Sequence, residues 1–262
     1  MRLIEFSDLE TWMIVYFAVL VFLLGAVFGS FLNCAAWRIS RKMDFIKSRS
    51  ICPKCKHVLG PVDLIPIVSY FLGKGRCRYC GEKISIRYPL TELLFGMAAL
   101  IMFFQSGISI LFLRNFAFAC CLFCLSLVDL EIYEIPDGCL FISLAAWVIC
   151  LPFLNVGWMY ILGHVGAAFL FGIGFLLLSL VMDKALKKES LGGGDIKLFF
   201  VSGLYLGVIG GMFAVVLAAL IGLVFARGKE KIPFGPFISI ATWCMMTFGE
   251  PLVNWYMSLL LL

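Results

Sequence analysis

The sequence predicts an all-α polytopic membrane protein with about eight transmembrane helices and one small polar domain between the first two. Two observations support this fold class. Hydrophobic residues make up 63% of the 262 residues and charged residues only 14%, which is too apolar for a soluble globule of this size. The apolar residues also fall into runs close to the roughly 20 residues that a helix needs to cross a bilayer.

The candidate spans extend from residue 12 to residue 260. They are 12–33, 90–106, 109–128, 136–155, 158–182, 196–210, 211–226 and 236–260. An even number of spans would place both termini on one side of the membrane. The sixth and seventh runs are short and meet at Gly210-Gly211, so one long bent helix is an alternative that changes this parity. The first run follows acidic residues, so we expect a retained helix rather than a secretory signal.

Basic residues concentrate between the first two spans. The segment 38–87 holds 12 of the 21 Lys and Arg residues, against only three acids. Because Lys and Arg are enriched in cytoplasmic loops, this segment is predicted to be cytoplasmic. The order of the spans then puts the end of the third span and the start of the sixth on the cytoplasmic face as well.

Two CxxC pairs lie inside this basic segment. Cys52 and Cys55 are followed, after 21 residues, by Cys77 and Cys80. In a reducing compartment, this pattern predicts a structural zinc site with four thiolate ligands. A redox pair or unligated thiols remain alternatives, with His57 as a substitute ligand.

Two aspartates stand where apolar runs end. Asp129 lies in SLVDLEIYEIPD and Asp195 in LGGGDIKLF, and ionisable residues at such depth are by default candidates for function. Two neighbouring carboxylates can share a proton and activate a water molecule. A charge at a helix end is the alternative for either acid. Asp129 also competes with Glu131, Glu134 and Asp137, although it follows the unbroken apolar run and should be the most buried.

Several ordered motifs resemble the bacterial type IV prepilin peptidases, which are GxGD-type aspartic endopeptidases. The resemblance covers nearly the whole chain. It rests on GSFLNCAAWR (29–38), SICPKC (50–55), DLIPIVSY (63–70), GRCRYC (75–80), ISIRYPLTE (84–92), VDLEIYEIPD (128–137), GGGDIKL (192–198) and IPFGPF (232–237). It implies about eight transmembrane helices, with Asp129 and Asp195 at the two catalytic positions.

The resemblance also implies a substrate. Members of this family remove a short basic leader from prepilins or type II secretion pseudopilins at the cytoplasmic face of the bacterial inner membrane. Many also methylate the new amino terminus with S-adenosylmethionine, so we expect this methyl donor besides zinc. We expect pilin precursors and membrane lipid as partners, and no nucleic acid.

The resemblance divides the chain into three expected parts: a first transmembrane helix over 1–37, a cytoplasmic zinc-binding domain over 38–89 and a transmembrane aspartic peptidase domain over 90–262. No GxGxxG string follows a strand, so the residues that bind the methyl donor are not evident. Glu92 is a weak candidate, because it lies near the membrane edge. A snorkelling acid or a partner of Arg87 is the alternative. The competing functions are a proton-coupled transporter and a non-catalytic pilus assembly factor that docks through its zinc domain.

Overall fold

The computed structural model describes residues 2–4, 10–43, 49–187, 191–225 and 232–260, and it divides the chain into two compact units, 2–112 and 113–262. Each unit is described on its own. The domain boundaries predicted from the sequence, after residues 37 and 89, were drawn by expected function. The boundary between the two compact units does not test them, so they stay predictions.

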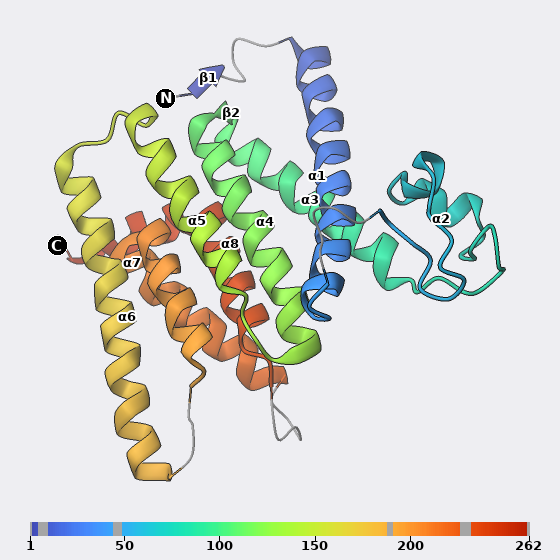
Figure 1. Ribbon diagram of the computed structural model, residues 1–262. Coiled ribbons are helices and arrows are strands. Elements are labelled where there is room, and N and C mark those ends of the chain that lie inside the picture. The colour runs from blue at the N-terminus through green and yellow to red at the C-terminus, as the bar shows by residue number, and fades with distance from the viewer. Residues whose placement is uncertain (1, 5–9, 44–48, 188–190, 226–231, 261–262) are drawn as a thin grey trace. The chain divides into compact units, whose positions relative to one another are not determined.

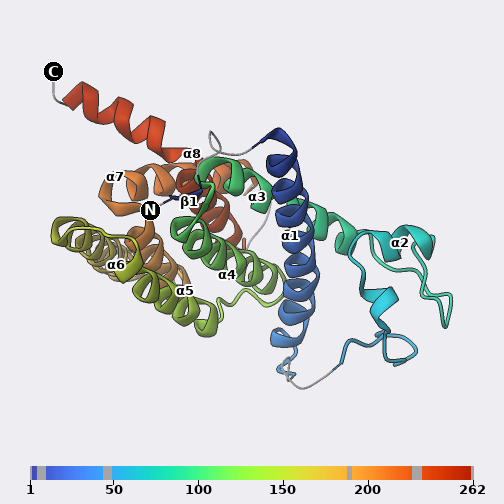
Figure 2. The same cartoon turned by 90° about the horizontal axis from the view of Figure 1, so that it is seen from above.

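The first unit is built on two long helices that pack side by side. α1 (Thr11–Ile39) crosses α3 (Arg87–Ser106), as Figure 2 shows. Small residues allow this close approach, since a Cβ added at Gly25 would lie only 2.8 Å from the Cβ of Ala99. A short ribbon completes the unit, in which β1 (Arg2–Ile4) pairs antiparallel with β2 (Ile108–Ser109).

The polar segment between α1 and α3 folds with little regular structure. It contains a 3₁₀ turn (Pro61–Leu64) and the short helix α2 (Val68–Leu72). Two isolated β-bridges, Ile51 with Val58 and Arg76 with Lys83, flank the two CxxC pairs. The segment therefore depends on turns and on its cysteines rather than on a hydrophobic core of its own.

The second unit is a helical bundle (Figure 1). It contains α4 (Ile110–Ile132, which begins just before the boundary), α5 (Asp137–Cys150), a 3₁₀ turn (Leu151–Phe153), α6 (Trp158–Leu186), α7 (Gly193–Phe225) and α8 (Gly235–Leu260). α7 packs against α5, α6 and α8. Tyr205 of α7 stacks on Phe118 of α4, with 3.9 Å between ring centroids, and donates a 2.8 Å hydrogen bond to the carbonyl of Ser143 in α5.

The sixth and seventh predicted runs form the single element α7, which is broken internally. The break lies at Gly207, with φ 70° and ψ −173°, and not at Gly210-Gly211 as predicted. Gly207 adopts the left-handed φ that glycine tolerates, whereas Gly211 is helical and lies against the ring of Phe171. His164 of α6 lies 2.9 Å from the carbonyl of Leu204, next to the break.

Within the described residues, five helices are long and apolar enough to cross a membrane: α1, α3, α4, α6 and α7. α5 is apolar but shorter. The predicted count of about eight spans is therefore not confirmed: α7 takes up two of the predicted runs, and neither α5 nor α8 is among the five. Large apolar side chains stay exposed on these helices, for example Leu162 and Leu177 of α6, which are 62% and 57% exposed. Such faces suit contact with lipid, and the chain is a multi-pass membrane protein of helical fold.

Candidate active site and metal centre

Asp129 lies in the last turn of α4 and is only 5% exposed. Of the four acids that compete in this stretch, Glu131 is half-buried, whereas Glu134 and Asp137 are exposed. The predicted order of burial is confirmed. Asp137 begins α5 directly after the capping residue Pro136, where a negative charge favours the positive end of the helix dipole. Asp137 therefore has a structural role that Asp129 lacks.

The carboxylate of Asp129 is held by the first residue of α8. The backbone N–H of Gly235 donates a 2.9 Å hydrogen bond to Oδ2 of Asp129. A Cβ at Gly235 would lie 2.8 Å from the same oxygen, so no larger residue fits without movement. The IPFGPF motif thus brings a helix N-terminus onto Asp129, and sequence reasoning missed this role. The available signal was a glycine followed by proline at the predicted start of an apolar helix.

Asp195 lies in the first turn of α7, which begins at Gly193. Its N–H donates to the carbonyl of Gly192 at 3.0 Å, and a Cβ at Gly192 would lie 3.1 Å from Oδ2 of Asp195. Gly194 faces the loop after α4, where a Cβ would lie 2.9 Å from Ile135. The glycine run therefore allows the start of α7 to pack against the segment that follows Asp129.

An ion pair joins the same two segments. Nζ of Lys197 lies 2.7 Å from Oδ1 of Asp137, and both side chains are more than half exposed. Lys197 is therefore the ionic partner of Asp137. Together with the Gly194 contact, this pair brings the end of α4 and the start of α7 to one place.

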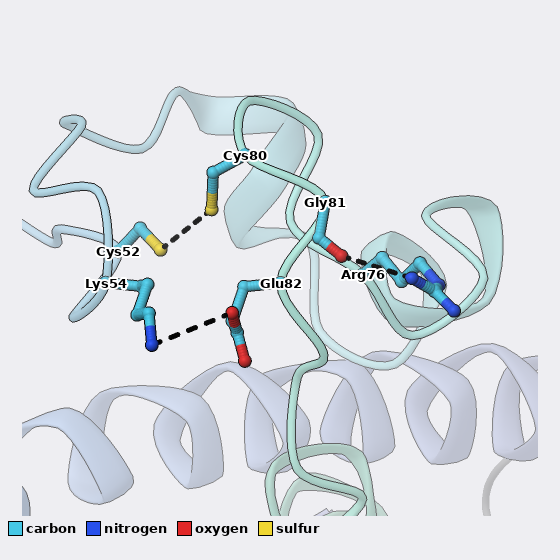
Figure 3. A network of polar contacts seen from close by, with 6 residues as sticks. All are labelled: Cys52, Lys54, Arg76, Cys80, Gly81 and Glu82. Atoms are coloured by element: carbon cyan, nitrogen blue, oxygen red, sulfur yellow. Dashed lines mark hydrogen bonds and ion pairs between the residues drawn. The ribbon is translucent and has the colours of Figure 1, made fainter.

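The two CxxC pairs converge on one point. The ligand sulfur atoms of Cys52, Cys55, Cys77 and Cys80 all lie within 4.8 Å of one another, and those of Cys52 and Cys80 are 4.0 Å apart (Figure 3). A tetrahedral zinc ion with bonds of about 2.3 Å to sulfur places its ligands roughly 3.8 Å apart, so the cluster fits zinc. His57 stacks on Tyr79, with 3.6 Å between ring centroids, and lies outside the cluster.

The two halves of the cluster share one backbone pattern. The N–H groups of Cys52 and Cys77 donate to the carbonyls of His57 and Glu82, five residues onward in each case. Four residues after the first cysteine of each pair comes a left-handed residue, Lys56 (φ 61°) in one half and Gly81 (φ 72°) in the other. The sequence shows the repeat of CxxC but not this difference, because lysine carries no signal for a left-handed conformation.

The thiols of the cluster differ in acidity. The pKa of Cys52 is lowered to about 7, chiefly because its sulfur accepts a hydrogen bond from the backbone N–H of Cys55. The backbone of Glu82 favours the Cys80 thiolate, but burial and the other three sulfur atoms outweigh this and raise the pKa of Cys80 to about 12. Once one of four close thiols has ionised, its negative charge makes ionisation of the next thiol less favourable. A divalent cation removes this opposition and allows all four to bind as thiolates.

Glu92 lies in α3 and is 8% exposed. Its carboxylate accepts a 2.7 Å hydrogen bond from the N–H of Ile67. Among the described residues no ion pair joins Arg87 to Glu92, so neither alternative role predicted for this acid fits its surroundings. Next to it, Thr91 accepts a hydrogen bond from the buried Asn33 of α1. The motifs GSFLN and YPLTE thus meet at one contact between α1 and α3, which the sequence did not reveal.

Comparison with known proteins agrees with the resemblance. The family model described as Bacterial Peptidase A24 N-terminal domain matches residues 23–106. The family model described as Type IV leader peptidase family matches residues 116–227. The prepilin leader peptidase/N-methyltransferase of Bacillus subtilis (strain 168) is 31% identical, over 92% of this chain and 98% of its own length. The protein of the same name from Neisseria gonorrhoeae is 30% identical, over 92% and 96%.

A third relative carries a different name. The type 4 prepilin-like proteins leader peptide-processing enzyme of Escherichia coli O78:H11 (strain H10407 / ETEC) is 32% identical, over 82% of this chain and 88% of its own length. No solved structure matches the chain. The fold and these matches define the class as a membrane-embedded peptidase. The chain belongs to the type IV leader peptidase family, which confirms the family that the sequence resembles.

Proposed function

We propose that this protein removes the leader peptide from prepilins or pseudopilins at the cytoplasmic face of the bacterial inner membrane, with Asp129 and Asp195 as its catalytic pair. The names of the relatives support the substrate class. The observation that most strongly supports the pair is the contact between the segment after α4 and the start of α7, where Gly194 faces Ile135 and Lys197 pairs with Asp137. The predicted peptidase domain, 90–262, contains both residues.

The chemistry follows from two interacting carboxylates. Like charges at close range keep one carboxyl protonated while its partner is ionised. The ionised carboxylate takes a proton from a water molecule, whose oxygen attacks the carbonyl carbon of the scissile peptide bond. The protonated partner hydrogen-bonds the carbonyl oxygen and then helps to protonate the leaving amine. The N–H of Gly235 holds Asp129 in position for this work.

A second activity concerns the new amino terminus. We assign to this chain the N-methylation of that residue, on the basis of the relatives named prepilin leader peptidase/N-methyltransferase. S-adenosylmethionine, as the co-substrate, would supply an electrophilic methyl group. The four cysteines would hold zinc and so order the segment 38–89, since their sulfur atoms fit one tetrahedral ion.

Asparagine variants test the catalytic pair. Asp129→Asn and Asp195→Asn keep the side-chain shape, and each is expected to abolish cleavage of a prepilin while the protein still inserts into the membrane. Glu134→Gln is the matched control, because it removes an exposed acid from the same stretch, and it is expected to cleave. Mass spectrometry of the product reports its amino terminus. Cleavage by either Asn variant would contradict the pair, and a wild type that cleaves nothing would favour a transporter or an assembly factor.

A further inference from the structure

A cavity of about 570 Å³ lies in the first unit, between α1, α3 and the segment that carries the cysteines. Its volume is within the range of about 300 to 1,000 Å³ typical of small-molecule sites. Ser30, Trp37 and Arg38 of α1 line it together with Tyr88 and Glu92 of α3. The cavity therefore combines aromatic faces, one buried carboxylate and a guanidinium group within a single wall.

Glu92 is the unusual feature of this wall. It is nearly fully buried and accepts a hydrogen bond from the N–H of Ile67, yet no ion pair with it is present within the described ranges. An ionised carboxylate out of water is costly unless a positive charge lies near it. Because Glu92 lines an open cavity, a bound cation is the most direct source of that charge.

Hydrogen bonding at Glu92 selects the kind of cation. An ammonium group brings three N–H donors that each need an acceptor, and a buried carboxylate that already accepts from Ile67 cannot satisfy all three of them by itself. A sulfonium carries positive charge on sulfur and has no hydrogen to donate. It can therefore lie against this carboxylate without leaving a buried donor unsatisfied.

We propose that this cavity binds S-adenosylmethionine and that Glu92 recognises its sulfonium charge. The inference deepens the proposed methylation and rests on it. The rings of Trp37 and Tyr88 provide faces for the purine, and Arg38 provides positive charge for the carboxylate of the ligand. Glu92 faces sulfur and not the amino group of the ligand.

A purely structural role for Glu92 makes a different prediction. Ile67 is a β-branched residue with φ 64° and ψ −54°, and the hydrogen bond from its N–H to Glu92 supports this strained conformation. Glutamine keeps an oxygen that accepts from Ile67 but lacks the charge. Glu92→Gln therefore removes recognition of the cation and retains the support for Ile67.

The test is a binding measurement on the full-length protein in detergent or nanodiscs, without a prepilin. Isothermal titration calorimetry compares S-adenosylmethionine with S-adenosylhomocysteine, which lacks only the methyl group and the sulfonium charge. Wild type is expected to prefer the sulfonium about tenfold or more, as a buried charge contact would give. Glu92→Gln is expected to lose that preference, and Glu82→Gln, an acid that lines the same cavity but is 51% exposed, is expected to keep it.

Three results would overturn the inference. One is a folded Glu92→Gln variant, with wild-type thermal stability and zinc content, that retains the preference. The second is a wild type that binds both ligands equally, which is decisive even where the variant does not fold. The third is a wild type that binds neither ligand, and this last result would also remove methylation from the proposed function. Cleavage of a prepilin, measured separately on the wild type, tests the peptidase proposal independently.

Discussion

Gly235→Ala is the most direct test of how the structure positions Asp129. The added methyl would lie 2.8 Å from Oδ2, 3.2 Å from Cγ and 3.4 Å from Cβ of Asp129. Gly235 has no left-handed φ, so the effect comes from this contact alone and not from backbone strain. The overlap must be relieved by moving α8, the carboxylate or both, and either movement lengthens the 2.9 Å hydrogen bond to Asp129.

The size of the effect follows from that hydrogen bond. A hydrogen bond to a charged group contributes about 1.5 to 3 kcal/mol. If the transition state depends on the position of Asp129, loss of this bond lowers kcat/KM by about 10- to 150-fold, since about 1.4 kcal/mol corresponds to a factor of ten. Crowding of a packed interior adds about 1 to 3 kcal/mol of destabilisation. Cleavage of a prepilin by purified protein and thermal unfolding measure the two effects separately.

Gly249→Ala is the matched control. Gly249 lies in the same helix, and its added methyl would also lie 2.8 Å from a neighbour, in this case the terminal methyl of Met245. A flexible methionine can move at little cost. The control is therefore expected to cleave within about twofold of wild type. A stable Gly235→Ala variant with wild-type kcat/KM would refute the positioning of Asp129 by α8.

Three further predictions concern the cysteine segment. Gly81→Ala is expected to destabilise it by about 1 to 2 kcal/mol, because open space surrounds the site and only the left-handed φ opposes a side chain. Lys56→Gly is expected to be neutral or stabilising at the equivalent position, and differential scanning fluorimetry compares the two. The pKa of Asp63 is held below its usual range, first by the N–H of Gly60 and then by Tyr79. Because the folded-state pKa is the lower one, Asp63 stabilises the fold above about pH 4, and the stability difference from Asp63→Asn should shrink as pH falls below that value. Removal of zinc by a chelator is expected to increase hydrogen exchange over 49–89, with one zinc released per chain by atomic absorption, and unchanged exchange would refute a structural metal.

The composition was sufficient to predict a helical membrane protein, and apolar runs located most of its helices. The boundary between the sixth and seventh runs was wrong because a glycine pair does not by itself reveal which glycine adopts an unusual φ. Gly207 is isolated in sequence, whereas Gly210 and Gly211 form the more conspicuous pair. His164 of another helix lies next to the carbonyl of Leu204 beside the break, and hydropathy carries no information about such a contact.

The candidate sites were predictable where the chemistry resides in a short string. Two CxxC pairs identify a cluster of sulfur atoms because the required spacing is local, and the fold brings all four together. The surroundings of the acids were not predictable in this way. Gly235 and Asp129 are 106 positions apart, so neither sequence neighbourhood indicates the other. For Glu92, the decisive neighbour is Ile67, which lies 25 positions away in a separate motif.

The glycines of three motifs have a shared physical role beside these acids. A Cβ at Gly192 or Gly235 would lie within 3.1 Å of a carboxylate oxygen of Asp195 or Asp129, and a Cβ at Gly29 would lie 3.1 Å from Cα of Glu92. Close approach of a backbone removes water from a carboxylate and, at Asp129, replaces it with an N–H donor. The sequence pattern alone predicts only helix packing for such glycines. Placed against the acids, they explain how a mostly apolar bundle fixes a few carboxylates in position.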